Sequence, residues 1–263
     1  MGVTLSEIKA FIKFSIFIKN ISTKLPTFWM LKSLFGPFIG RKKLLYISVP
    51  SIYVKCPNGN AVQPYRKRGS MLGGVRTDLP WVRPHDGNAA SYIKVLFSDF
   101  VEDIKIVPDE DIDDRMIREN LVCIGGQSNW VFEQFVINQN YILPLEYRID
   151  RNKVIDGFYN SETGQSYESQ DRHRSYGLLA VVRNPQAYNK RIVFVSGLDA
   201  DSTLEIARTL KDNLNKIYQK AKSVKLIRSD FYCICCFKRT GDPKIPLIYD
   251  DVFISKISAN TSQ

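Results

Sequence analysis

The chain has 263 residues, of which 44% are apolar and 24% are charged. These proportions are ordinary for a globular protein and exclude a disordered or fibrous chain. The length accommodates one sizeable α/β core with an appendage, and it is short for two full domains.

The formal net charge of +10 is concentrated at the two ends of the chain. Residues 1–43 carry eight Lys and Arg side chains against Glu7 alone, whereas the middle of the chain is close to neutral. A basic end favours an anionic surface, such as phospholipid headgroups, nucleic acid or an acidic protein. The alternative is a solvated face that binds nothing.

The N-terminal part is basic and aromatic. Residues 8–21 alternate as a half-buried strand does, and their lysines exclude a membrane-spanning helix. A short helix is predicted at Phe28–Phe35, which Gly36-Pro37 ends. We treat residues 1–43 as an extension that packs on the main domain or on a protein partner. The alternative is docking at an anionic membrane surface, which would make the protein membrane-peripheral.

The main domain, residues 44–263, begins by alternating strands with helices. Strands are predicted at Leu44–Tyr53, Ile104–Val107 and Leu121–Ile124, with a helix at Ala89–Val101. The polar segment Val54–Asn88 is unusually long for a loop inside a compact domain, which suggests a lid or a partner-binding loop. After the third strand and its helix, Tyr141–Ile149 predicts another strand, and the stretch that follows, residues 150–175, predicts a hairpin.

The rest of the domain is organised around Tyr176–Tyr218. The strand Ile192–Ser196 is apolar on both faces, as a central strand covered by helices must be. Gly197 then lets the backbone turn into a long amphipathic helix. Two further strands, Asp230–Lys238 and Ile245–Ile257, predict a C-terminal β-hairpin.

The five cysteines are odd in number, and Cys233, Cys235 and Cys236 crowd into one predicted strand. This pattern argues against a disulfide framework and favours a reducing cytosol. Cys236 lies on the opposite face from the other two, and the run lacks the spacing of a zinc knuckle. We therefore expect buried thiols, no metal site and a cytoplasmic protein.

Two strand-glycine-helix units provide the candidate ligand sites. Gly125-Gly126 follows the strand Leu121–Ile124, and its free N–H groups could approach a phosphate while Ser128 or Asn129 caps the helix or binds a ribose. The second unit places Gly197, Asp199 and Asp201 at the start of the next helix. The first loop lacks the third glycine of a dinucleotide loop and the Gly-Lys-Ser/Thr of a P-loop. Tight turns and helix capping are the alternatives, and no cofactor is identified.

No catalytic set is recognisable. The chain has two histidines, His85 and His173, and neither belongs to a nucleophile elbow or a metal-ligand helix. Glu133 or Asp199 could serve a nucleotide- or NAD-processing enzyme, although no spacing singles them out. Arg66-Lys67-Arg68 and the basic side chains between Arg208 and Arg228 could follow a nucleic-acid backbone, without a recognisable nucleic-acid module.

From Leu121 to about Leu210 the chain resembles a set of poorly characterised prokaryotic Rossmann-like proteins, some of them associated with defence or signalling. The resemblance is carried by Gly125-Gly126 with Asn129, by Tyr176-Gly177-Leu178-Leu179 and by Asn184-Pro185, followed by the strand that ends in Gly197. It implies a small-ligand or nucleotide sensor, or a subunit that passes a signal to an effector.

These observations predict a Rossmann-like α/β domain with a mostly parallel sheet flanked by helices, a basic N-terminal extension and a C-terminal hairpin. We expect a non-enzymatic sensor or adaptor subunit that binds a nucleotide-like ligand, or a protein partner through residues 1–43, within a prokaryotic defence complex.

Overall fold

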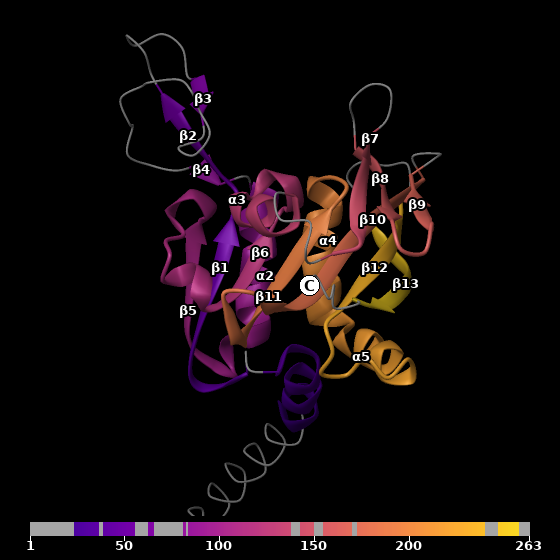
Figure 1. Cartoon of the computed structure of the whole chain (residues 1–263), viewed down its shortest axis with the longest axis horizontal. Coiled ribbons are helices and arrows are strands. Elements are labelled where there is room, and N and C mark those ends of the chain that lie inside the picture. Colours follow the sequence, from indigo (N-terminus) through magenta and orange to yellow (C-terminus); the bar gives the residue numbers. More distant parts are fainter. Residues whose placement is uncertain are drawn as a thin grey trace, which may run out of the picture.

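A computed structural model describes residues 24–36, 39–55, 63–65, 81–82, 84–137, 143–149, 155–169, 173–239 and 247–257. An α/β architecture is built on a seven-stranded sheet in the order β13-β12-β10-β11-β6-β1-β5 (Figure 1). The strands are β1 (Gly40–Val49), β5 (Val101–Pro108), β6 (Asn120–Ile124), β10 (Arg174–Asn184), β11 (Ala187–Gly197), β12 (Phe231–Lys238) and β13 (Ile248–Lys256).

The sheet is mixed rather than mostly parallel. Strands β5, β1, β6 and β11 run parallel to one another. Strands β10, β12 and β13 add to them in antiparallel fashion. The reason is local: β10 and β11 form a hairpin around Asn184, so β10 must run against β11. The predicted C-terminal hairpin is confirmed as β12 and β13, while the residues that connect these strands, 240–246, lie outside the described residues.

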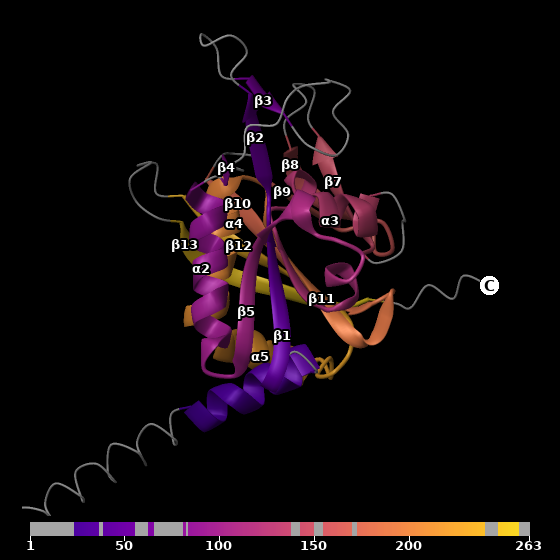
Figure 2. The ribbon, with the colours of Figure 1, turned by 90° about the vertical axis from the view of Figure 1, so that its left-hand side faces the viewer.

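Helices cover one face of the sheet, as Figure 2 shows. They are a helix at residues 24–35, α2 (Pro84–Ser98), α4 (Ala200–Asp212) and α5 (Leu214–Ser223). These helices form one hydrophobic core with the strand residues that point to this side, among them Ile47, Val122 and Val195. Alternation along the strands sends Tyr46, Leu121 and Phe194 to the opposite side.

The opposite face is covered by shorter elements. They are 3₁₀ turns η3 (Asp109–Asp111), η4 (Met116–Arg118) and η5 (Gly126–Ser128), then α3 (Trp130–Phe132), a π-helical turn η6 (Glu133–Ile137) and a small antiparallel sheet of β7 (Leu145–Ile149), β8 (Ile155–Asn160) and β9 (Ser166–Glu168). Phe132 and Phe158 pack in this second core. The predicted hairpin after Ile149 is β8 and β9.

Two predicted boundaries are wrong. The single strand Leu44–Tyr53 is divided at Pro50 into β1 and β2 (Ser51–Lys55), because proline has no N–H for the ladder. Strand β2 instead pairs with β3 (Gln63–Tyr65) and β4 (Trp81–Val82). The helix predicted at Ala89–Val101 instead runs from Pro84, a residue suited to a first helical turn, to Ser98, and Val101 begins β5. Most of the predicted lid or partner loop, including Arg66–Arg68, lies outside the described residues.

The long helix predicted after Gly197 is divided at Asn213 into α4 and α5. Asn213 leaves the helical region, with φ −120° and ψ 24°, while its N–H still bonds to the carbonyl of Thr209 at 2.7 Å. Asparagine favours such helix ends because its side chain competes for backbone hydrogen bonds. The amphipathic pattern continued across this break, so periodicity alone did not reveal it.

The helix at residues 24–35 packs on the domain, as expected for its aromatic face. Phe35 contacts Phe97 with ring centroids 5.4 Å apart, and Phe28 contacts Phe100 at 5.8 Å. Trp29 stays 53% exposed on the outer side of this helix. Residues 1–23, including the predicted strand, lie outside the described residues. Within the described ranges, no helix combines the length and hydropathy needed to cross a bilayer.

Candidate functional site

The predicted glycine loops lie side by side at the carboxyl ends of β6 and β11. The N–H of Gly125 donates to the carbonyl of Val195 at 2.9 Å, which joins the first loop to the strand that delivers the second. Gly125 and Gly126 have φ values of +91° and +44°, a region that disfavours residues with a Cβ. The sequence therefore predicted correctly that both loops follow the carboxyl ends of neighbouring central strands.

The chain's own atoms fill the space beside these glycines. A Cβ on Gly126 would lie 2.2 Å from the hydroxyls of Tyr147 and Ser196, and one on Gly125 would lie 2.5 Å from Pro50. A Cβ on Gly197 would meet Ser202 Oγ at 2.3 Å. Close packing within the chain is thus sufficient to require glycine at all three positions.

Asn129 is a fully buried polar connection at this edge. Its Oδ1 accepts from the N–H of Val131 at 2.9 Å, which caps the short helix α3. Its Nδ2 donates to the carbonyl of Ile124 at 2.9 Å and to the carbonyl and Oγ of Ser48 at 3.2 and 3.1 Å. Asn129 therefore ties the end of β1 to the end of β6. Ser128 donates to the carbonyl of Gly125 at 2.5 Å.

Asp109 makes a second buried connection that sequence reasoning missed. Oδ1 accepts from the N–H and Oγ of Ser51 at 2.9 and 2.7 Å, and Oδ2 accepts from the N–H of Trp130 at 2.7 Å. The sequence gave no sign that the Asp109 carboxylate is completely buried against Ser51, the first residue of β2, 58 positions away.

Asp199 and Asp201, the carboxylates of the second glycine loop, also bind partners within the chain. Asp199 caps α4 in a reciprocal capping box with Ser202 and pairs with Arg239. Asp201 Oδ1 lies 3.2 Å from Nε2 of His85. The capping role weighed for Asp199 is confirmed, and the structure connects His85 to Asp201 across two helix starts.

Two hydroxyl groups occupy the space beside the first glycine loop. The sequence did not single them out. Tyr147 Oη and Ser196 Oγ lie 2.6 Å apart beside Gly126. Burial raises the pKa of Tyr147, so the phenol stays protonated and acts as a hydrogen-bond partner rather than a base. Glu133, the other candidate acid, is half-buried on η6.

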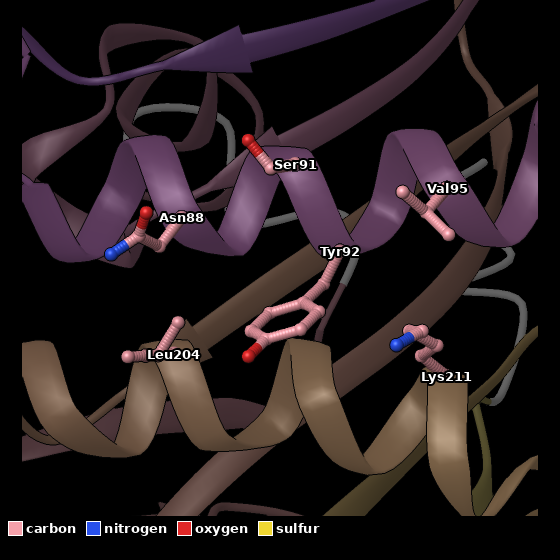
Figure 3. Close-up of a pocket in the computed structure, with 6 residues that line it drawn as sticks. All are labelled: Asn88, Ser91, Tyr92, Val95, Leu204 and Lys211. Atoms are coloured by element: carbon pink, nitrogen blue, oxygen red, sulfur yellow. The ribbon is translucent and has the colours of Figure 1, made fainter.

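A groove lies between α2 and α4 (Figure 3). It has a volume of about 330 Å³ and is lined by Asn88, Ser91, Tyr92, Val95, Leu204 and Lys211. The Tyr92 ring reaches across toward Leu204, and the Lys211 ammonium lies 5.2 Å from the centre of that ring. Val95 is 57% exposed and contributes apolar surface to this groove.

A second hollow of about 480 Å³ lies between α4 and the start of β13. Glu205 lines it, and both Nε and Nη2 of Arg208 approach its Oε1, at 2.9 and 2.7 Å. Burial raises the pKa of Glu205, and Arg208 opposes the rise. Arg208 is therefore engaged with Glu205 on its own helix rather than free to bind a phosphate.

The expected burial of the thiols is confirmed for Cys123 and for the three cysteines of β12. Cys233 and Cys235 face the helical layer and Cys236 the other layer, as the spacing predicted. No group of three or more potential metal ligands occurs among the residues that the structure describes.

Comparisons with protein-family models, with curated proteins and with solved structures found no match for this chain.

Proposed function

We propose that the chain is a non-enzymatic adaptor subunit whose α2–α4 groove holds a helical segment of a protein partner. The groove, with its exposed Val95, is the observation that carries this proposal. The glycine loops favour a protein partner over a nucleotide ligand, because the chain itself fills the space beside Gly125, Gly126 and Gly197.

The shape and chemistry of the groove suit an amphipathic helix. Two neighbouring helices form its walls, so a third helix could lie along it with apolar anchors toward the floor. Tyr92, Val95 and Leu204 offer that apolar floor, while Lys211 at one end favours a carboxylate on the partner. The partner segment is therefore apolar on one face and acidic beside it.

The finer fold assignment belongs to the same proposal. Four parallel strands with α2 and α4 on one face support a Rossmann-like domain extended by antiparallel strands. The resemblance carried by Gly125-Gly126, Asn129 and Asn184-Pro185 supports a place in a cytoplasmic prokaryotic defence or signalling complex.

The test is native mass spectrometry of the protein purified from its own host, with Val95→Glu as the variant. The wild-type chain is expected to retain one protein partner in fixed stoichiometry, and Val95→Glu to lose it. Tyr188→Glu is the matched control, because Tyr188 is 83% exposed in the β10–β11 hairpin. Equal retention by both variants would reject the groove, and a wild-type chain without any partner would reject the adaptor function.

A nucleotide-processing enzyme is the second candidate, favoured by the Tyr147–Ser196 hydroxyl pair beside Gly126. A nucleotide could bind there only if these hydroxyls moved from the glycine. Turnover of NAD or ATP that Ser196→Ala or Glu133→Ala abolishes would establish this candidate and displace the adaptor proposal. No turnover and no thermal stabilisation by either nucleotide is the result that we expect.

A further inference from the structure

The end of α5 holds a lysine in a backbone conformation that favours glycine. Lys225 has a φ of 59°, and its N–H donates to the carbonyl of Lys222 at 3.1 Å. The N–H of Leu226 donates to the carbonyl of Ala221 at 2.9 Å. These two bonds form a Schellman motif in which Lys225 occupies the C′ position, and glycine is the usual residue there because it has no Cβ.

Arg228 occupies a comparable position in the next turn. The N–H of Ser229 donates to the carbonyl of Leu226 at 3.0 Å, so Arg228 is the third residue of a β-turn. Its φ of 66° is one that glycine or asparagine adopts more readily at this turn position. Within the described ranges, Lys225 and Arg228 are the residues that combine a side chain with a positive φ. Two basic side chains that break a local backbone rule indicate a function beyond folding.

Both residues belong to a continuous basic region. Between Asn213 and Ser229 the chain has five basic residues and no acidic one. Lys216 lies over the ring of Tyr249, 5.0 Å from its centre. The other four are exposed, have no carboxylate partner within the described ranges and are called the α5 basic surface: Lys220, Lys222, Lys225 and Arg228.

The helix at residues 24–35 lies beside this surface. The N–H of Arg228 donates to the carbonyl of Ser33 at 3.1 Å, which joins the α5 basic surface to the helix. Figures 1 and 2 both show the indigo helix and α5 at the end of the domain opposite β2. A single flat partner can therefore contact both elements.

The exposed face of this helix is apolar and basic. Leu25 and Trp29, one turn apart, are 52% and 53% exposed, and the Lys32 ammonium lies 5.7 Å from the centre of the Trp29 ring. At the end of α5, Val224 is 44% exposed next to Lys225. Tryptophan and aliphatic side chains beside lysines are typical of a membrane interface, where the apolar groups enter the headgroup region and the ammonium groups attract anionic lipids.

We propose that the α5 basic surface and the exposed face of the helix at residues 24–35 dock the protein on an anionic phospholipid membrane. The positive charge selects anionic headgroups, and the exposed Leu25, Trp29 and Val224 gain by burial in the interface. A nucleic acid would bind the same charges, but aliphatic side chains give its bases no stacking platform. None of these residues lines the α2–α4 groove, so the docking does not depend on the function proposed for that groove.

Co-sedimentation of the full chain with vesicles tests the proposal. We expect binding to phosphatidylcholine vesicles that contain about one third phosphatidylserine, weaker binding as the salt concentration rises, and little binding to phosphatidylcholine alone. Equal binding to both kinds of vesicle, or no binding to either, would overturn an anionic membrane as the partner.

Replacing Lys225 and Arg228 together by glycine separates binding from folding. The double variant should keep an equal or higher Tm, because glycine suits both backbone positions. It should bind the phosphatidylserine vesicles about thirtyfold more weakly, the factor expected for two basic side chains near an anionic surface. A lower Tm would show that the two side chains support the fold and would overturn their assignment to membrane binding.

Lys105→Gln combined with Lys238→Gln is the matched control. Both lysines are about half exposed on β5 and β12, and the change in net charge is the same. Equal losses of binding in the two double variants would show a response to net charge alone and would reject the proposed surface. Unchanged binding after replacement of Lys225 and Arg228 would reject it as well.

Replacing the exposed Trp29 by alanine distinguishes a membrane from a nucleic acid. We expect Trp29→Ala to weaken vesicle binding about tenfold, because the indole no longer enters the interface. A DNA duplex is the competing probe. Tighter binding to the duplex than to the phosphatidylserine vesicles, with vesicle binding unchanged in Trp29→Ala, would overturn the membrane in favour of a nucleic acid.

Discussion

Replacing Asn129 by alanine tests whether the glycine-loop motif is a structural connection. The side chain is completely buried, and its amide satisfies the Val131 N–H and the carbonyls of Ser48 and Ile124. Each buried polar group left without its partner costs about 1–3 kcal/mol, and loss of the helix cap alone costs about 1 kcal/mol. These terms overlap because the loop relaxes, so we expect a total loss of about 3 kcal/mol.

The assay is urea unfolding followed by circular dichroism, with thermal unfolding as a second measure. For a domain of this size, about 3 kcal/mol corresponds to a fall in Tm of roughly 9 °C. Ser128→Ala is the control, because Ser128 is half-buried and makes one bond to Gly125, so its loss should stay below about 1 kcal/mol. Equal stability of the two variants would refute the structural role of Asn129.

Three further predictions concern packing and charge. Gly126→Ala should lower the free energy of unfolding by about 3 kcal/mol, because its Cβ meets Tyr147 and Ser196. Gly164→Ala, at φ +71° with nothing within 4 Å of the added Cβ, should lower it by about 1 kcal/mol. Equal losses in chemical unfolding would mean that the two hydroxyls simply move away from the new methyl group. Burial raises the pKa of Glu205 above its ordinary 4.5, so its contribution to stability is fully present below pH 4.5 and is lost as the pH rises through the folded-state pKa. Glu205→Gln should therefore gain stability relative to the parent as the pH rises above 4.5, and a relative loss in unfolding titrations would contradict this sign. In the helix at residues 24–35, replacing the buried Leu34 by alanine should lower the free energy of unfolding by about 3 kcal/mol, and replacing the exposed Trp29 by less than about 0.5 kcal/mol. A larger loss for Trp29→Ala in thermal unfolding would show that the helix does not pack as described.

Strand positions were the most predictable part of the fold. Ile192–Val195 is apolar throughout and lies buried in the centre of the sheet as part of β11. The alternation of Cys233, Cys235 and Cys236 between the two faces likewise followed from spacing alone. Local patterns of burial survive folding because a strand's side chains alternate whatever its neighbours are.

Strand direction was not predictable in the same way. The hairpin around Asn184 makes β10 run against β11, and the place of β10 beside β11 depends on which strand edge is free. The interruption at Asn213 was hidden because the apolar face continues from α4 into α5. Such features depend on contacts between distant elements, which a local pattern does not encode.

The candidate site was predicted in position but not in detail. Both glycine loops lie at the expected edge, whereas the partners of Asn129 and Asp109 come from β1 and from Ser51. The α2–α4 groove had no sequence signal, because it forms only where residues of two helices far apart in the sequence lie side by side.

The buried amide of Asn129 also bears on the order in which the chain folds. Its bonds to Ser48 join residues 81 positions apart, and the bond between Asp109 and Ser51 spans 58 positions. Closing such long loops is slow and unfavourable until neighbouring strands are already aligned. The amides of Ser51, Trp130 and Val131 should therefore acquire protection from hydrogen exchange after those of β10 and β11, which close through a hairpin. In refolding experiments with pulsed labelling, this edge of the sheet would mark the completion of the native state.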